Sequence, residues 1–185
     1  MRWNRHLGLQ GEHAFLSPSS YHWINYTRDR LEERWTAAQA GAYGIMQHEY
    51  AKREIEARRR SNMTSTIGMY INDAIRYRMS CEQVLFYSEH CFGTVDAISF
   101  RGRLLRIHDL KTGVVKTSVH QLEVYAALFC LEYGVDPFAI RIELRIYQSD
   151  EVARWDGDPE DVAAIMARIV EFDQILNQLR LEEES

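Results

Sequence analysis

Hydrophobic positions along the chain follow two different periods. The first 80 residues are dense in helix formers, with apolar side chains three or four positions apart. Between about residues 82 and 110, apolar and polar residues alternate, which is typical of strands. Helical spacing then returns, another alternating segment follows, and the chain ends in an amphipathic stretch. This order predicts an α/β fold, a mixed sheet flanked by helices, with an N-terminal helical segment.

Several predicted helices begin or end at local signals. Ser17 precedes Pro18 as an N-cap would, and Ser118 stands before a helix that Gly134 stops. Gly41 interrupts a long helical segment and predicts a break there. The last helix either packs on the sheet or forms a subunit interface. The helices are expected over residues 18–26, 29–60 in two parts, 65–78, 119–133 and 159–181.

The strands are predicted from alternation and from the turn residues between them. The Arg101-Gly102-Arg103 stretch is a hairpin-type connection between two alternating segments. Strands are expected over residues 82–87, 93–100, 104–110 and 140–147, with 151–155 as a candidate fifth.

Two carboxylates and a lysine are predicted to meet on one face of this sheet. Asp109 and Lys111 are two positions apart in a strand, so they share a face. The hairpin can bring Asp96 beside Asp109. Two carboxylates with a cation next to them suit Mg²⁺ or Mn²⁺ and metal-assisted hydrolysis of a phosphodiester. A structural ion pair in an apolar strand is the alternative, because unpaired buried charges are costly.

Composition narrows the class of protein. The 185 residues, 46% of them hydrophobic, suit one domain. The three cysteines are widely spaced and form no CxxC pair, which supports neither a disulfide framework nor a zinc–cysteine site. No apolar run approaches the length of a membrane span, and the first residues lack the apolar core of a signal peptide. We therefore expect a cytoplasmic protein with no membrane partner.

The net charge of −5 argues against a nucleic-acid partner until it is divided along the chain. Residues 1–125 hold 17 basic and 13 acidic residues, whereas residues 126–185 hold 5 and 14. The acid excess therefore lies in the last third. The basic run near residue 60 has two explanations. It is either the solvated end of a helix or a set of contacts to DNA phosphates, and the sequence fits both. The basic residues expected to contact DNA are Lys52, Arg53, Arg59, Arg60 and Lys116.

Four motifs occur in an order that resembles the PD-(D/E)XK nuclease superfamily. They are GIMQHE at residues 44–49, GTVD at 93–96, DLKTG at 109–113 and QLEVYA at 121–126. The resemblance is to the RecB-like branch, which includes CRISPR-associated adaptation exonucleases and phage-encoded recombination exonucleases. It spans about residues 16–147 and implies one restriction-endonuclease-like domain over the whole chain. Its implied parts are a mainly helical region (1–80), a catalytic sheet with the QxxxY helix (81–147) and a C-terminal strand and helix (148–185).

The resemblance implies roles for individual residues. Asp96 and Asp109 match the metal-binding carboxylates of the family, and Lys111 matches its catalytic lysine. His48 matches the histidine that completes the metal site, and the backbone carbonyl of Leu110 is implied as a further ligand.

The resemblance also implies an activity. Gln121 and Tyr125 match the QxxxY motif, which lies near the active site and the DNA backbone. The expectation is a Mg²⁺- or Mn²⁺-dependent deoxyribonuclease, with an exonuclease acting at DNA ends in phage recombination or repair as the first hypothesis. Its setting would be an infected bacterium, with a recombinase or single-strand annealing protein as partner. No iron–sulfur cluster is expected, because no cysteine follows Cys130. The alternatives are an endonuclease or nickase on the same fold, and a non-catalytic module that binds DNA ends or protein.

Overall fold

The computed structural model describes residues 14–113 and 117–183. The chain divides into two compact units, one up to Tyr43 and one from Gly44 onward. The predicted DNA contact Lys116 lies outside the described residues. No described helix is long and apolar enough to cross a membrane.

The first unit holds a short 3-10 helix, η2 (Pro18–Asn25), and the first part of α1 (Arg28–Glu56). The Ser17 side chain does not cap η2. Its hydroxyl instead contacts that of Ser19 at 2.8 Å, while the Trp23 indole N–H donates to the Ser17 carbonyl at 2.9 Å. The predicted helix therefore exists in a tighter form, with Ser17 at the N-cap position and Pro18 at its start as predicted, but without a hydrogen bond from the capping side chain.

The predicted break near residue 41 is wrong, because α1 is continuous from Arg28 to Glu56. A Cβ at Gly41 would meet nothing within 4 Å, so this glycine stands in open space. A helix-interior glycine costs only about 1 kcal/mol relative to alanine. The helix formers on both sides outweigh that cost.

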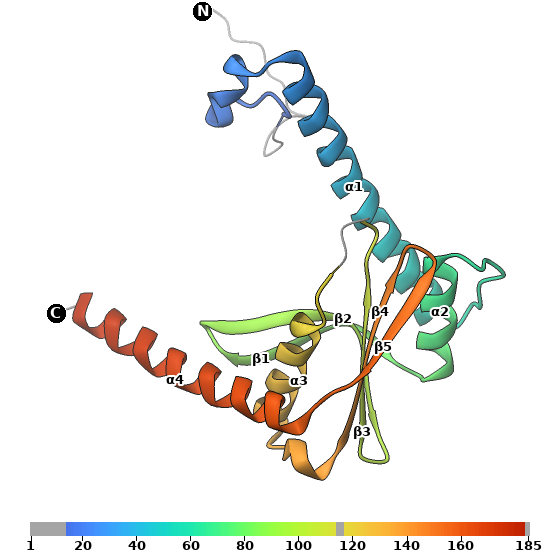
Figure 1. The fold of residues 1–185 in the computed structure, drawn as a ribbon, viewed down its shortest axis with the longest axis vertical. Coiled ribbons are helices and arrows are strands. Elements are labelled where there is room, and N and C mark those ends of the chain that lie inside the picture. Colours follow the sequence, from blue (N-terminus) through green and yellow to red (C-terminus); the bar gives the residue numbers. More distant parts are fainter. Residues whose placement is uncertain (1–13, 114–116, 184–185) are drawn as a thin grey trace, which may run out of the picture. The chain divides into compact units, whose positions relative to one another are not determined.

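The second unit is built on a five-stranded mixed sheet with the order β1-β2-β3-β4-β5 (Figure 1). The β3–β4 pair is parallel and the other pairs are antiparallel. The candidate fifth strand is present. The strands are β1 (Ser80–Ser88), β2 (Cys91–Arg101), β3 (Leu104–Leu110), β4 (Arg141–Gln148) and β5 (Glu151–Asp156).

Two turns confirm the local signals in this unit. The β2–β3 hairpin turns at Gly102 and Arg103, whose φ angles of 55° and 60° match the two-residue turn that suits antiparallel strands. Gly134 ends α3 (His120–Tyr133) in the left-handed conformation, as predicted. Ser118 is not the N-cap of α3, which is Val119; its hydroxyl accepts from the backbone N–H of His120 at 3.3 Å.

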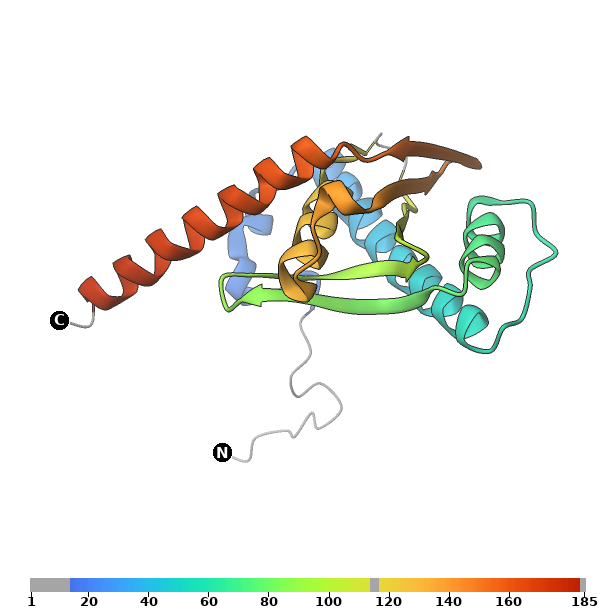
Figure 2. The ribbon, with the colours of Figure 1, turned by 90° about the horizontal axis from the view of Figure 1, so that it is seen from below.

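Helices cover both faces of the sheet. On one face, Leu105, Ile107, Ile142 and Leu144 pack against α3 and the start of α4 (Pro159–Glu183), with η3 (Pro137–Ala139) alongside. On the other face, α2 (Thr66–Arg76) and the end of α1 pack around a second apolar cluster that includes Tyr147. Figure 2 shows α3 crossing the β1–β2 hairpin, which it contacts.

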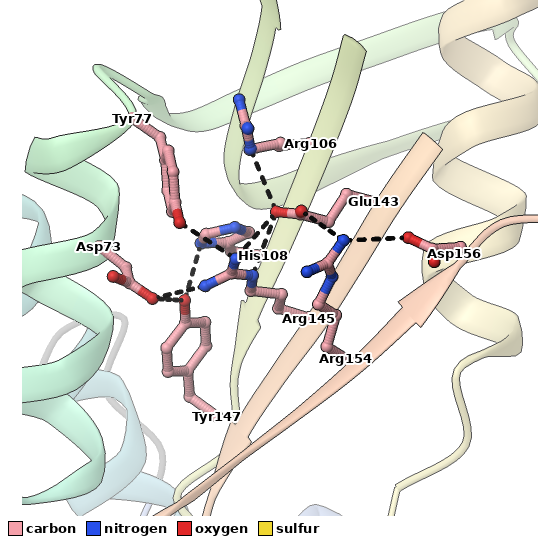
Figure 3. Close-up of polar contacts among 9 residues, drawn as sticks. All are labelled: Asp73, Tyr77, Arg106, His108, Glu143, Arg145, Tyr147, Arg154 and Asp156. Carbon is pink, nitrogen blue, oxygen red and sulfur yellow. Dashed lines mark hydrogen bonds and ion pairs between the residues drawn. The ribbon is translucent and has the colours of Figure 1, made fainter. Parts of the chain in front are cut away.

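A buried ionic network lies on the α2 face of the sheet (Figure 3). Glu143 in β4 is 5% exposed and accepts from three arginines. The distances from its carboxylate are 3.1 Å to Arg106, 3.1 Å to Arg145 and 3.2 Å to Arg154. A buried carboxylate is tolerated only when it is paired in this way.

The network continues to a fully buried histidine. The Tyr147 hydroxyl donates to Asp73 Oδ2 at 2.8 Å, so it accepts from His108 Nδ1 at 3.1 Å. Nε2 of His108 has no hydrogen-bond partner among the described residues. Burial, and after it the nearby charges of Arg145 and Arg106, lower the pKa of His108 to about 3. The imidazole is therefore neutral in the folded protein.

We predict that His108 makes the protein sensitive to acid. Its folded pKa is depressed, so below about pH 6.5 the unfolded chain binds a proton that the folded chain does not. Stability is then lost as the pH falls from about 6.5 toward 3, by about 2 kcal/mol at pH 5. Urea unfolding at about pH 7 and 5 should show a smaller loss for His108→Asn than for wild type. The matched control, His22→Asn at an exposed position, should retain the wild-type loss. Equal losses in all three proteins would contradict the assignment.

Candidate metal site at the end of the sheet

Asp96 and Asp109 lie where strands β2 and β3 stop pairing. The antiparallel ladder ends with Ala97 opposite His108, so these two carboxyl groups occupy the next position of the register. There the backbone N–H of Leu110 donates to Asp96 Oδ2 at 2.8 Å. The side chain of Asp96 thus replaces a backbone acceptor and holds the separating strands together. The predicted juxtaposition of the two carboxylates is present.

His48 reaches this point from α1. It lies on the side of the helix that is buried at Gly44, Ala51 and Ile55. Its Nδ1 is 3.6 Å from Asp96 Oδ1, and its side chain is 30% exposed. The structure therefore brings the predicted histidine to the predicted carboxylate.

Glu82 is a site residue that the sequence reasoning missed. Ligand atoms of His48, Glu82 and Asp96 all lie within 4.8 Å of one another. In β1, Cys81 pairs with Ala97 and Gln83 with Val95, so Glu82 stands opposite Asp96. Its φ of 50° marks an irregularity in the strand. No local pattern indicates it, because the β1–β2 register shifts between Phe86 and Ser88.

Lys111 connects the second carboxylate to α3. Its ammonium donates to Asp109 Oδ1 at 3.0 Å and to Gln121 Oε1 at 3.1 Å. Asp109 is 4% exposed, and its Oδ2 has no hydrogen-bond partner among the described residues. One oxygen of a buried carboxylate is thus left without compensation.

Burial disfavours the charged form of both carboxyl groups. Burial, and after it the neighbouring charge of Asp109, raise the pKa of Asp96 to about 6 against the opposing effects of His48, the Leu110 N–H and Lys111. Burial also raises the pKa of Asp109, against the opposing charge and hydrogen bond of Lys111. The site thus holds more negative charge than its protein neighbours neutralise.

The glycines of two motifs permit close approach at this site. A Cβ at Gly44 would lie 2.8 Å from Thr112 Oγ1, so the glycine lets α1 approach the loop after β3. A Cβ at Gly93 would lie 3.1 Å from the Tyr125 ring. The Tyr125 hydroxyl donates to the Thr94 carbonyl at 2.6 Å, and burial raises its pKa. Tyr125 therefore holds α3 to β2 beside the site.

The predicted DNA-contacting residues on α1 and just after its end fall into two groups. Arg59 makes two hydrogen bonds to Glu54, at 2.9 and 2.8 Å, and Arg53 lies 3.7 Å from the same carboxylate. Both arginines are thus already paired within the chain. Lys52 is one turn beyond His48 and half-buried, whereas Arg60 is exposed.

The donor set fits a hard divalent cation. Carboxylate oxygens with one imidazole nitrogen suit Mg²⁺ or Mn²⁺, and the uncompensated oxygen of Asp109 is a buried polar atom that such a cation would satisfy. His48, Glu82 and Asp96 would hold the ion from one side, and Asp109 from the neighbouring strand. The predicted role of the Leu110 carbonyl as a ligand stays a prediction.

Comparisons with known proteins add little to this site. No family model matches the chain, and no curated protein matches it. A solved structure titled "Crystal structure of SSO0001" is similar with a TM-score of 0.37 and 14% sequence identity. The similarity covers 60% of this chain and 56% of that chain. At this TM-score it supports neither a family nor a function.

We predict that neutralising Asp96 stabilises the metal-free protein. The raised pKa means that folded Asp96 binds a proton more readily than the unfolded chain, so its ionised form costs stability above about pH 6. Asn can still accept from the Leu110 N–H. Asp96→Asn should therefore gain on the order of 2 kcal/mol at about pH 7.5, and the gain should shrink toward pH 4.

Urea unfolding in the presence of a chelator measures this difference. Glu49→Gln, at an exposed position next to His48, is the matched control and should change stability little at either pH. A loss of stability in Asp96→Asn at neutral pH would contradict the prediction.

Proposed function

We propose that this chain is a metal-dependent deoxyribonuclease with a PD-(D/E)XK-type core. The observation that carries the proposal is the buried oxygen of Asp109 that lacks a partner, next to Asp96 and to Lys111. Buried polar atoms nearly always have a hydrogen-bond partner, and Lys111 bonds only the other oxygen of Asp109, so a ligand that binds this oxygen accounts for it better than an ion pair alone. The order of the four sequence motifs supports the same proposal.

The side chains divide the chemistry of phosphodiester hydrolysis between them. A bound divalent cation would supply a water of lowered pKa and offset charge on the phosphate. Asp96 and Asp109 would hold it, with Asp96 fixed in place by the Leu110 N–H. The Lys111 ammonium has three N–H donors, and its bonds to Asp109 and Gln121 use two of them. The third can orient the attacking water or contact a phosphate oxygen.

The finer parts of the proposal rest on the motif resemblance alone. These are the exonuclease activity, the role in phage recombination or repair, and a recombinase or single-strand annealing protein as partner. An endonuclease or nickase would use the same site residues. A non-catalytic module that binds DNA ends would have no need of the combination of Asp96, Asp109 and Lys111, which weighs against it.

We predict that digestion of linear DNA with Mn²⁺ depends on the site. Lys111→Ala and Asp109→Ala should each lower the rate by about 100-fold or more, because each removes a group placed at the reacting phosphate. The control Glu49→Gln should retain the wild-type rate, because its side chain is exposed on α1. Equal digestion by wild type, Lys111→Ala and Asp109→Ala would overturn the catalytic assignment.

The choice of DNA separates the activities in the same assay. Substrates labelled at the 5′ or the 3′ end report polarity, and closed circular DNA should stay intact if the enzyme requires an end. Cutting of the circle by wild type but not by Lys111→Ala would favour the endonuclease alternative.

A further inference from the structure

The apolar side chains of helix α4 face the core in the first half of the helix and are exposed in the second half. In its first half, Val162, Ile165 and Ile169 pack against the core with α3. In its second half, the side of the helix that faces the rest of the unit carries polar residues. There Asp173 accepts from Asn177 at 3.0 Å, and Arg180 pairs with Glu89 at 3.1 Å.

The apolar side chains of the second half are left uncovered. Phe172 is 50% exposed, Ile175 43%, Leu176 42% and Leu179 49%. Figures 1 and 2 both show this part of α4 continuing past the end of α3. Four large apolar residues on one side of a helix are an interaction surface rather than scattered exposure.

These residues also continue a heptad pattern. Ile165, Ile169, Phe172, Leu176 and Leu179 alternate in steps of four and three, which is the spacing of a helix–helix seam. The seam extends over 15 residues, or about 21 Å of helix. A partner helix with the same spacing is the occupant that such a seam fits.

A groove runs beside the seam. It has a volume of about 360 Å³, with α4 as one wall and Val124 of α3 and the turn at His90 and Cys91 as the other. The α4 wall includes Ile165, Phe172 and Leu176. Seam and groove together form a surface that a single helix could fill.

Charged residues beside the seam indicate which partner helix fits it and whether that helix runs parallel or antiparallel. Arg168, which also makes an exposed pair with Glu171 of its own helix at 2.9 Å, and Glu182 flank the seam at equivalent heptad positions. When two copies of α4 run antiparallel about a twofold axis near Ile175, Arg168 of each copy lies opposite Glu182 of the other. Phe172 then faces Leu176 of the other copy. The surface is therefore complementary to itself.

We propose that a second copy of this chain docks its α4 antiparallel against this one, which forms a symmetric dimer. Each α4 fills the groove of the other, so both apolar seams are covered by one contact. This interface is separate from the candidate metal site, and it does not depend on the proposed nuclease activity.

Sedimentation equilibrium over about 1–100 µM tests the dimer. Wild type should approach twice the 21.7 kDa mass of one chain at the upper end. Leu176→Glu should weaken association by at least about 30-fold. Gln178→Glu makes the same substituent at an exposed position off the seam and should leave association within about threefold of wild type. A monomeric wild type throughout, or equal effects of the two substitutions, would overturn the proposal.

Two further sets of variants test the geometry and remain informative if Leu176→Glu is unstable. Arg168→Glu and Glu182→Arg should each weaken the dimer, and the double variant should restore it. In the wild-type background, Ile175→Cys should form an intermolecular disulfide on oxidation, whereas Leu179→Cys should not. Cross-linking at residue 179 alone, or no restoration in the double variant, would overturn the antiparallel arrangement.

Discussion

The burial of two neighbouring carboxyl groups is the constraint on which this structure depends. Asp96 and Asp109 sit at the point where two strands separate, and Lys111 is the one cation bonded to them among the described residues. Burial of such groups without full compensation costs several kcal/mol. The surrounding chain reduces this cost locally, through the Leu110 N–H and His48, but leaves one oxygen of Asp109 unsatisfied. Such an unfavourable burial of charge is most readily explained where a bound cation neutralises the carboxylates.

The opposite face of the sheet gives this site its rigid base. Tyr147 is fixed by Asp73 and His108, and its backbone carbonyl accepts from the N–H of Lys111 at 2.9 Å. The ionic network around Glu143 therefore fixes the backbone of β4. The backbone of β4 in turn fixes Lys111, the residue that follows β3. A site needs such support when its groups must stay close despite their mutual repulsion. The ionic network of Figure 3 thus supports the candidate site without being part of it.

Much of this arrangement follows from the sequence because its signals are local. The bounds of β3, the turn at Gly102 and the end of α3 at Gly134 depend on alternation and on backbone conformation, and all three are found as predicted. Glu82 was missed because it comes to the site through the β1–β2 register, which no local pattern reveals. The break near Gly41 was wrong because a glycine signal is weak against strong neighbours in a helix. Gly44, in contrast, is required by a contact with Thr112, which lies 68 positions away in the printed sequence.

The central claim is that Asp96 and Asp109 form a site for a divalent cation. Calorimetric titration of the metal-free protein with Mn²⁺ tests it most directly, because binding is measured without any assumption about substrate. The account predicts saturable binding by wild type, a weaker affinity in Glu82→Gln, and loss of binding in Asp109→Asn while that variant remains folded. Folded wild-type protein that does not bind Mn²⁺ or Mg²⁺, or an Asp109→Asn variant that binds as wild type does, would contradict it.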